Sequence, residues 1–410
     1  MFVSGGIPGD TVLAEVTQER PRYSKGRVVE VLEPSESRIE PRCRYSNICG
    51  GCQMQTMAYR TQLEWKRRFV VDALARIGKV DGAEELVGEC APSKMDWGYR
   101  NKVELIPTAC NGKLQLGYHG RGSDEVVPIE ECLLLPKRYQ KAPKALAGAL
   151  RYLKAGDYSL ERVGIRTSQR TGSAQVNLWT APGYFPRQMA AKVLGSALDI
   201  TSLVRTLVKG ETSARRVSKV EVLDGEEVWR EKLGEFEMVA SGPSFFQVNT
   251  RGAERLVGLA MEGLDVQPQD SCCDLYCGTG TFTLPLAARS DDVLAVESAS
   301  SSIHDLRRNL DGNGLEAEII GGDAVLESQG IGQVDKLVMD PPYKGMGPRF
   351  SDSVKALDPM RIVLVSCNPT TLARDVCTLR DIGYELEGAT PVDMFPQTFH
   401  VETVAVLSKI

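Results

Sequence analysis

Apolar and polar residues alternate in two runs near the start of the chain. The runs cover residues 12–16 and 27–32, and a basic turn separates them. This alternation predicts two β-strands that pair across the turn. Pro34 and Pro41 follow the second run and predict an irregular connection after it.

Residues 57–78 have the spacing of an amphipathic helix. Apolar side chains recur at helical intervals with basic residues between them, and Gly78 is expected to end the helix. The apolar positions are Leu63, Phe69, Val70, Leu74 and Ile77, and the basic positions are Lys66, Arg67 and Arg68. The basic edge fits either a solvated surface or a contact with RNA.

Residues 85–245 have a mixed pattern, in which short strands are broken by loops and by one helical stretch. Strands are expected at residues 102–107, 113–119, 173–179 and 217–223, and the helix at residues 137–153. The pattern therefore predicts a β-rich unit of mixed α and β structure in the middle of the chain.

From residue 246 onward, strands and helices alternate. Strands are expected at residues 272–276, 293–297, 318–320, 336–339 and 362–366, and helices at residues 282–289, 300–311 and 370–382. Such alternation predicts an α/β fold with a doubly wound, mainly parallel sheet. Ligands of these sheets bind beyond the carboxyl ends of the strands, where the candidate site residues of this region lie.

A glycine loop follows the first of these strands. It runs from Asp274 through Gly278 and Gly280 into a helix, and its glycines let the backbone approach a ligand closely. Glu297 ends the next strand, where a carboxylate can accept both hydroxyls of a ribose. Asp323 ends the third strand and can face the amine of an adenine. Because the full G-x-G-x-x-G pyrophosphate fingerprint is absent, this arrangement favours S-adenosylmethionine (SAM) over NAD.

Asp340-Pro-Pro-Tyr343 follows the fourth of these strands. Rigid prolines after an acid hold backbone carbonyls at a fixed place near a reacting methyl group. The letters DPPY are also the signature of amino-methyltransferases that act on adenine N6 or cytosine N4. That class of enzyme is therefore a rival interpretation.

A cysteine stands at the tip of the last of these strands, in Ser366-Cys367-Asn368-Pro369. Methylation of carbon 5 of uracil needs a nucleophile that first adds to carbon 6, and a thiolate both adds and leaves readily. Carbon 5 then takes the methyl group from the sulfonium of SAM, and a base removes its proton. Glu402, in a strand-like run at residues 401–408, is the candidate base.

The chain has 11 cysteines in 410 residues, and we find neither a secretory segment nor an apolar run long enough to cross a membrane. A cytoplasmic protein is expected, in which cysteines are thiols, metal ligands or catalytic groups. Cys43, Cys49 and Cys52 are spaced closely enough to ligate a metal. The candidates for a fourth ligand are Cys132, which we prefer, Cys90 and Cys110. Four thiolates suit zinc or an iron–sulfur cluster, whereas the spacing differs from the C-x3-C-x2-C of radical methyl-cofactor enzymes.

Together, these motifs resemble the RNA uracil-5 methyltransferases that act on 23S ribosomal RNA or on the T-loop of tRNA. The resemblance covers most of the chain. The motifs are C-x5-CGGC at 43–52 with a later cysteine, FFQVN at 245–249, DLYCGTGTFTLPLA at 274–287, DPP at 340–342, SCNP at 366–369 and HVETV at 400–404. The chain departs from the family at Tyr343, where Arg is common, and at Thr281, where some members carry Asn.

The resemblance implies three domains. Residues 1–40 would form a partial TRAM module, which is a small OB-like β-barrel that binds RNA. Residues 41–245 would form a β-rich central domain with a 4Fe–4S cluster, and residues 246–410 a Rossmann-like class I methyltransferase domain. The first strand of the barrel is expected to be missing before Met1, and the helix at 57–78 is expected to pack with the catalytic domain.

The resemblance also assigns roles to residues. The implied cluster ligands are Cys43, Cys49, Cys52 and Cys132. The implied contacts of SAM are Gln247, Tyr276, Thr281, Glu297, Asp323 and Asp340. Cys367 matches the nucleophile of the family and Glu402 its base.

We therefore predict a SAM-dependent enzyme that methylates carbon 5 of a uridine in RNA, with 23S rRNA as the preferred target and tRNA as the alternative. The net charge is -5, yet residues 1–70 carry an excess of basic side chains that can steer an RNA. The uridine must leave its stack to reach a thiol, and Phe245, Phe246 and Tyr343 are candidates to hold it. A non-catalytic RNA-binding protein is the rival from another class; neither a membrane nor a protein partner is implied.

Overall fold

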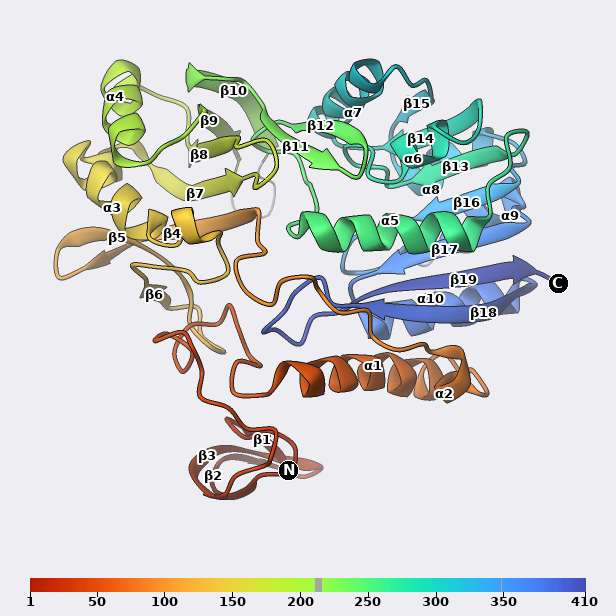
Figure 1. The fold of residues 1–410 in the computed structure, drawn as a ribbon, viewed down its shortest axis with the longest axis horizontal. Coiled ribbons are helices and arrows are strands. Elements are labelled where there is room, and N and C mark those ends of the chain that lie inside the picture. The colour runs from red at the N-terminus through yellow and green to blue at the C-terminus, as the bar shows by residue number, and fades with distance from the viewer. Residues whose placement is uncertain (211–215, 348) are drawn as a thin grey trace.

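The computed structural model describes residues 1–210, 216–347 and 349–410. A small amino-terminal sheet lies at the bottom of the view in Figure 1, next to the long helix α1 (Tyr59–Arg76). Above α1, a central sheet occupies the left half of the view and a carboxyl-terminal sheet the right half. The chain is therefore built around three separate sheets, and a two-stranded ribbon joins the two larger ones.

The amino-terminal sheet has three strands, β1 (Phe2–Ser4), β2 (Thr11–Arg20) and β3 (Tyr23–Glu33), with β3 in the middle. β2 and β3 pair antiparallel and confirm the two strands predicted from the alternation. Large apolar side chains such as Leu13 and Val29 remain exposed on this sheet. The assignment of these residues to a TRAM barrel stays a prediction.

The central sheet has seven strands in the order β10-β9-β8-β7-β4-β5-β6. Its strands are β4 (Lys102–Cys110), β5 (Lys113–His119), β6 (Val126–Pro128), β7 (Leu160–Thr167), β8 (Ala174–Thr180), β9 (Ser202–Lys209) and β10 (Arg216–Gly225). Helices α3 (Ala142–Tyr152) and α4 (Arg187–Ala197) pack against it and supply Leu146, Leu150 and Leu194 to its core. The four predicted strands are confirmed, whereas β6, β7 and β9 were not predicted.

The carboxyl-terminal sheet has seven strands in the order β15-β14-β13-β16-β17-β19-β18. Its strands are β13 (Ser271–Leu275), β14 (Asp292–Glu297), β15 (Glu318–Gly321), β16 (Lys336–Met339), β17 (Arg361–Ser366), β18 (Tyr384–Val392) and β19 (Glu402–Lys409). The first five are parallel and confirm the five predicted strands. β19 runs antiparallel between β17 and β18. The fold is therefore a mixed α/β fold with a mainly parallel sheet.

Helices cover both faces of this sheet. The predicted helices are confirmed as α6 (Thr283–Ala287), α7 (Ser300–Asn313) and α10 (Pro369–Asp381). The other elements of this region are α5 (Thr250–Leu264), α8 (Ala324–Glu327), α9 (Phe350–Leu357) and the ribbon of β11 (Trp229–Leu233) and β12 (Phe236–Ala240). None of the helices in the described ranges combines the length and apolar character needed to cross a membrane.

Helix α5 was missed in the sequence although it carried a readable signal. The side chain of Asn249 caps its first turn by accepting a hydrogen bond from the Gly252 amide (3.1 Å). Ala253, Leu256, Ala260 and Leu264 then recur at helical spacing and are buried against the sheet. The cap and this spacing together would have predicted the helix.

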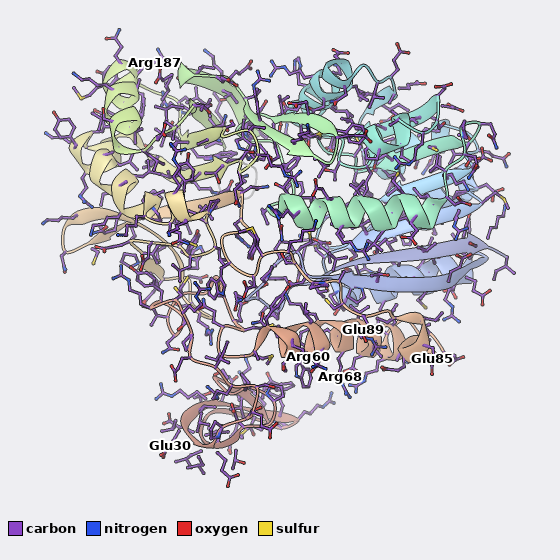
Figure 2. All side chains as sticks on the ribbon, in the orientation of Figure 1. Glu30, Arg60, Arg68, Glu85, Glu89 and Arg187 are labelled. Carbon is purple, nitrogen blue, oxygen red and sulfur yellow. The ribbon has the colours of Figure 1, made fainter. Side chains whose placement is uncertain are left out.

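Helix α1 confirms the helix predicted at residues 57–78, and it packs against α10 and β18 through Val70, Val71 and Leu74. Arg60 and Arg68 lie on its exposed side (Figure 2). The proposed basic edge is wrong for Lys66, which is fully buried and donates to Asp393 (2.5 Å) and to the Phe395 carbonyl (3.0 Å). A lysine can occupy the buried face because a carboxylate on the neighbouring segment compensates its charge.

The end of α1 differs from the prediction at Gly78. Ile77 is the C-cap residue in right-handed geometry, and Lys79 is the residue with a positive φ of 52°. Gly78 is instead required by close packing, because a Cβ there would lie 2.8 Å from the Leu74 carbonyl oxygen and 3.1 Å from that of Ala373 in α10. The glycine therefore fixes how closely the end of α1 approaches α10.

We expect Lys66→Met to lower the free energy of unfolding by about 3–5 kcal/mol, because it leaves the carboxylate of Asp393 buried without its partner. Urea denaturation followed by fluorescence measures this change. Arg60→Met is the matched control, since the Arg60–Glu64 pair on the same helix is exposed and should contribute less than about 1 kcal/mol. Equal effects of the two substitutions would show that the buried pair is not a principal contact of α1.

Candidate functional site

Residues from five parallel strands lie together at the carboxyl edge of the carboxyl-terminal sheet. Leu275 of β13 pairs with Val296 of β14 and with Met339 of β16, and Met339 pairs with Leu364 of β17. Residues that end or follow such strands lie along one edge. The predicted site residues at this edge are Tyr276, Glu297, Asp323, Asp340 and Cys367.

Glu297 holds the glycine loop in place. Its Oε2 accepts a hydrogen bond from the Gly278 amide (3.0 Å), and its Oε1 accepts one from the Ala299 amide (2.7 Å). Within the loop Gly280 has a φ of 99° and Tyr276 a φ of 67°, a left-handed conformation that is costly for a side chain as large as tyrosine. The loop therefore adopts a strained turn around a fixed carboxylate. The Ser298 hydroxyl also donates to Oε1 (3.4 Å), whereas Oε2 has a second lone pair that a ligand can use.

The other acids of this edge differ in exposure. Asp323 is exposed and caps α8, its Oδ1 accepting from the amides of Val325 and Leu326. Asp274 is fully buried, accepts from the Thr283 hydroxyl (2.6 Å), and burial raises its pKa to about 8. Thr281 is buried within the loop. Asp274 therefore supports the loop from inside, whereas Asp323 faces solvent.

Gln247 reaches this edge from the segment before α5. Its Nε2 donates to Oδ2 of Asp340 (3.1 Å), and its backbone carbonyl accepts from Nδ2 of Asn101 (2.8 Å). Asn101 is buried and lies just before the central strand β4. It was missed in the sequence, where no local pattern indicated its distant partner. The central unit thus holds the glutamine that touches Asp340.

Strand pairing sets Cys367 beside Glu402. Ser366 at the end of β17 pairs with Thr403 of β19, so the next residue of one strand lies by the previous residue of the other. Asn368 caps α10 by accepting from the Thr370 amide (3.0 Å), and Pro369 opens that helix as predicted. Cys367 therefore stands between a buried carboxyl group and a helix N-terminus.

The environment of Cys367 opposes ionisation in the free protein. Burial raises the pKa of its thiol to about 12, and the nearby carboxylates of Glu402 and Asp340 contribute to the rise. Burial and the charge of Asp340 also raise the pKa of Glu402, which is 4 % exposed. Burial raises the pKa of Asp340 as well. Three groups that prefer to keep a proton thus share one small volume.

A cavity of about 290 Å³ opens beside Cys367, and Tyr343, Phe399 and His400 line it together with Phe69 and Asp72 of α1. Among the aromatic residues proposed to hold a flipped base, Tyr343 lines this cavity. The proposal is wrong for Phe246, which is 1 % exposed and packs edge-on against Trp229 (5.3 Å between ring centroids).

Phe245 is 59 % exposed and stays available. Phe399 is half exposed on the cavity wall and was not singled out in the sequence, although it directly precedes the HVETV motif. Its position next to that motif was the only available signal.

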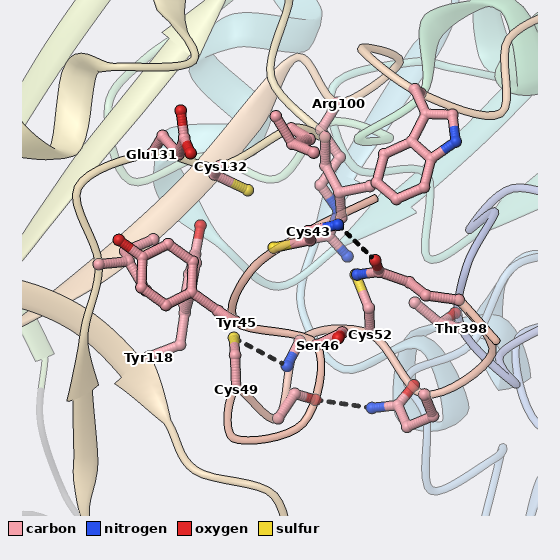
Figure 3. A pocket seen from close by; sticks show the side chains of 18 of the residues that line it. Cys43, Tyr45, Ser46, Cys49, Cys52, Arg100, Tyr118, Glu131, Cys132 and Thr398 are labelled. Carbon is pink, nitrogen blue, oxygen red and sulfur yellow. Dashed lines mark hydrogen bonds between the residues drawn. The ribbon is translucent and has the colours of Figure 1, made fainter. Parts of the chain in front are cut away.

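A second cavity, of about 230 Å³, lies between the central sheet and the loop before β19 (Figure 3). Three cysteines that are close in the sequence and a fourth that is distant line it, and their side chains face the same space in Figure 3. These are Cys43, Cys49, Cys52 and Cys132. Cys110 lies at the end of β4 and Cys90 beside Asp393 and Lys66, so the weaker candidates for a fourth ligand lie elsewhere.

Partly buried thiols and a cationic side chain line the cysteine cavity. Burial raises the pKa of Cys49, of Cys132 and, to about 12, of Cys52, and Arg100 lines the cavity as well. In the described ranges, no three His, Cys, Asp or Glu side chains are close enough together to hold a single metal ion. The four thiols therefore surround a space instead of converging on one point.

Comparisons with known proteins find similar RNA methyltransferases. The family model described as tRNA (uracil-5-)-methyltransferase matches residues 207–320 and 326–410. A protein named as an uncharacterized RNA methyltransferase from Thermosynechococcus vestitus is 36% identical, over 100% of this chain and 93% of its own length. A second such protein, from Halalkalibacterium halodurans, is 33% identical over 99% of this chain and 92% of its own.

Among solved structures, the tRNA (uracil-54, C5)-methyltransferase of Pyrococcus abyssi, in complex with S-adenosyl-L-homocysteine, is similar over almost the whole chain. It is 25% identical, the match covers 99% of this chain and 95% of that chain, and the TM-score is 0.74. The likeness includes the central sheet as well as the carboxyl-terminal sheet, because a match to the carboxyl-terminal sheet alone would not cover this share of the chain.

We expect Glu402→Gln to lower the pKa of the Cys367 thiol. Where Glu402 is ionised, its carboxylate disfavours the neighbouring thiolate, so its replacement by a neutral amide favours the thiolate in that range of pH. The pH profile of alkylation of Cys367 by iodoacetamide, read by mass spectrometry of the peptide that contains it, measures the shift. Each unit by which the pKa falls raises the thiolate fraction about tenfold below the midpoint.

Glu385→Gln is the control for this measurement, because Glu385 is exposed at the opposite end of β18. Its profile should match that of the unmodified chain. A profile that stays in place in Glu402→Gln as well would show that the two side chains do not interact.

Proposed function

We propose a specific reaction for this chain, which belongs to the tRNA (uracil-5-)-methyltransferase family of SAM-dependent RNA methyltransferases. In this reaction a uridine of RNA is methylated at carbon 5 while Cys367 is bonded transiently to carbon 6. The observation that carries the proposal is the pairing of Ser366 with Thr403, since it brings a thiol and a buried carboxyl group to one strand end.

The cofactor would lie along the carboxyl edge of the sheet. Glu297 is fixed by two backbone amides and would accept hydrogen bonds from the ribose hydroxyls of SAM. Oδ1 of Asp323 binds backbone amides, and its Oδ2 would accept a hydrogen bond from the adenine amine. The remaining proposed contacts are Gln247, Tyr276, Thr281 and Asp340. When bound, SAM supplies an electrophilic methyl group on a positively charged sulfur.

Cys367 would act first. Its thiolate adds to carbon 6 of the uracil, and the electrons of the C5–C6 double bond move to the O4 enolate, which makes carbon 5 nucleophilic. After methylation, carbon 5 carries both the methyl group and its original proton. Glu402 removes that proton, the double bond forms again, and the sulfur leaves as thiolate.

The electrostatics of the site suit this order of events. A carboxylate with a raised pKa is a stronger base than an exposed one, which favours Glu402 as the acceptor of a carbon-bound proton. The raised pKa of Cys367 is a cost, since the thiol must ionise before it attacks. The N-terminus of α10 and a cationic ligand beside Asp340 both favour the thiolate, so we propose that it forms only in the loaded site.

The cavity beside Cys367 would receive the flipped uridine. Tyr343 and Phe399 offer rings on its wall for stacking, and Asp72 of α1 lies there as well. Methylation of an exocyclic amine needs no nucleophile of the enzyme. The rival reaction therefore does not explain why Cys367 lies beside Glu402. The uracil reaction therefore accounts for more of the site than the rival based on DPPY.

For the RNA itself, we propose 23S rRNA as the target, with the T-loop of tRNA as the second candidate. The tRNA candidate is supported by the likeness of the chain to a solved protein named tRNA (uracil-54, C5)-methyltransferase. We also propose a cytoplasmic location and an RNA-binding role for residues 1–40 as a TRAM module.

We expect cells that lack this gene to lose 5-methyluridine at one site, and mapping of modified uridines in rRNA and tRNA identifies that site. Restoring the gene should restore the methyl group, whereas Cys367→Ala should not, although it should still bind SAM.

Glu402→Gln should accumulate a covalent RNA–protein adduct on denaturing gels, because release of the thiolate requires removal of the proton. Methyl groups on an exocyclic nitrogen, or full activity of Cys367→Ala, would refute the reaction.

We further propose that Cys43, Cys49, Cys52 and Cys132 hold a 4Fe–4S cluster, with zinc as the alternative. Four thiols around a cavity fit a cluster of several atoms better than a single ion, because an ion draws its ligands to one point. Arg121 lies beside this segment and donates to the carbonyls of Ser46 and Cys52. Methyl transfer needs no electron, so the cluster would supply a rigid cross-link.

Chain purified without oxygen should contain iron and sulfide in equal amounts. We expect Cys132→Ser to lose the metal, since it removes one ligand from the cavity wall. Cys110→Ser is the matched control and should keep the metal, because Cys110 lies outside the cavity. Elemental analysis that finds one zinc and no iron would support the alternative.

A further inference from the structure

One loop forms a wall of both cavities. It connects β18 with β19, and Thr398 and His400 line the cysteine cavity. Phe399, His400 and Val401 line the cavity beside Cys367. His400 therefore borders both spaces, and Glu402 follows it by two residues. Any displacement of this loop changes the two cavities together.

Two buried polar side chains of α1, one turn apart, hold the loop. Oε1 of Gln62 accepts from the Gln397 amide (3.0 Å), and its Nε2 donates to Oε1 of Gln397 (3.2 Å). Lys66 binds Asp393 and the Phe395 carbonyl at the start of the loop. Gln62 is 1 % exposed and Gln397 3 % exposed, so water cannot replace these bonds without opening the structure.

Gln62 and Gln397 also hold residues 43–54, the segment that contains Cys43, Cys49 and Cys52 and that we call the cysteine segment. The amides of Gln53 and Met54, directly after Cys52, both donate to the Gln397 carbonyl (3.0 and 2.9 Å). Nε2 of Gln62 lies within hydrogen-bond distance of the carbonyls of Met54 (3.1 Å) and Met57 (2.9 Å). The path from Cys52 to the loop therefore passes through one residue, Gln53.

Buried amides that lose their partners cost about 1–3 kcal/mol each. A shift of the cysteine segment therefore has two outcomes: either the bonds to Gln397 break at this cost, or the loop follows the segment. The loop lies between the fixed ends of β18 and β19, so it follows by changing the placement of residues 397–401. Those residues carry His400 and lead directly into the strand that begins with Glu402.

We propose that Gln62 and Gln397 are positioning residues that couple the state of the cysteine cavity to the placement of His400 and Glu402 beside Cys367. A filled cavity would hold residues 43–54 rigidly and thereby fix the loop. An empty cavity would release both. The role of Glu402 rests on the function proposed above, whereas the coupling of the two cavities is a property of the fold.

Hydrogen–deuterium exchange of the metal-loaded chain, before and after removal of the metal by chelation, tests the coupling without substrate. We expect amides in residues 393–404 to exchange about tenfold faster after removal, the equivalent of about one lost buried hydrogen bond. Residues 43–57 should change as well. Amides of α10, which packs on α1 away from the cavity lined by Cys43, Cys49, Cys52 and Cys132, should not change.

Gln62→Met removes the polar contacts while keeping a side chain of similar volume. In this variant residues 393–404 should already exchange fast in the loaded state and respond little to chelation. Glu64→Gln, on the exposed side of the same helix, should behave as the unmodified chain does. If Gln62→Met does not fold, Gln397→Ala removes the side-chain bonds to Gln62 and to the Asp96 carbonyl but keeps the three backbone bonds of residue 397, and it should show a smaller effect in the same direction.

Kinetics separate positioning from a general loss of structure. Gln62→Met should lower kcat for methylation about tenfold with KM for SAM nearly unchanged, because the loop leads to Glu402 and lines the proposed uridine cavity but carries none of the proposed SAM contacts. The coupling is refuted if chelation alters residues 43–57 and leaves 393–404 unchanged, if Gln62→Met responds to chelation as the unmodified chain does, or if the purified chain holds no metal. An inactive chain whose loop still responds to chelation would refute the proposed function but not the coupling.

Discussion

The antiparallel pairing of β19 with β17 is the interaction on which the site depends. The parallel strands alone carry to their common edge only residues that follow each strand. β19 enters that edge from the opposite direction, so its first residue, Glu402, arrives where β17 ends at Ser366. The connection from β18 must then cross the same edge, and this crossing brings His400 to the wall of two cavities. One reversed strand therefore gives the edge both the buried acidic group beside Cys367 and its contact with the cysteine cavity.

The chemistry at this edge follows from low dielectric as much as from residue identity. Cys367 and Asp340 are partly buried and Glu402 is buried, and each charge among them raises the cost of the next. The free protein therefore keeps its protons on these groups. A positive charge placed among them by a ligand would reverse this preference, which supports the proposal that the thiolate forms only in the loaded site.

The amino-terminal part of the chain takes part in the site through buried polar contacts. Lys66 and Gln62 of α1 reach the loop before β19, and Asn101 reaches the backbone of Gln247. Apolar packing would join these parts with less specificity, because it tolerates small shifts of one surface over the other. Hydrogen bonds with buried partners fix the parts to within a narrow range of positions.

Local pattern determined most of the carboxyl-terminal elements, because the five parallel strands are continuous apolar runs and each is followed by a recognisable glycine, acid or cysteine. Pattern also indicated Cys367 and Glu402 as a pair of candidates. Sequence could not determine that Lys66 is buried or that Phe246 is sealed against Trp229, since both depend on partners far along the chain. Strand order, the direction of β19 and the shared loop were likewise decided only by the tertiary structure. The physical reason is that periodicity reports how a residue relates to its own helix or strand, whereas burial and charge compensation depend on which distant segment packs against it.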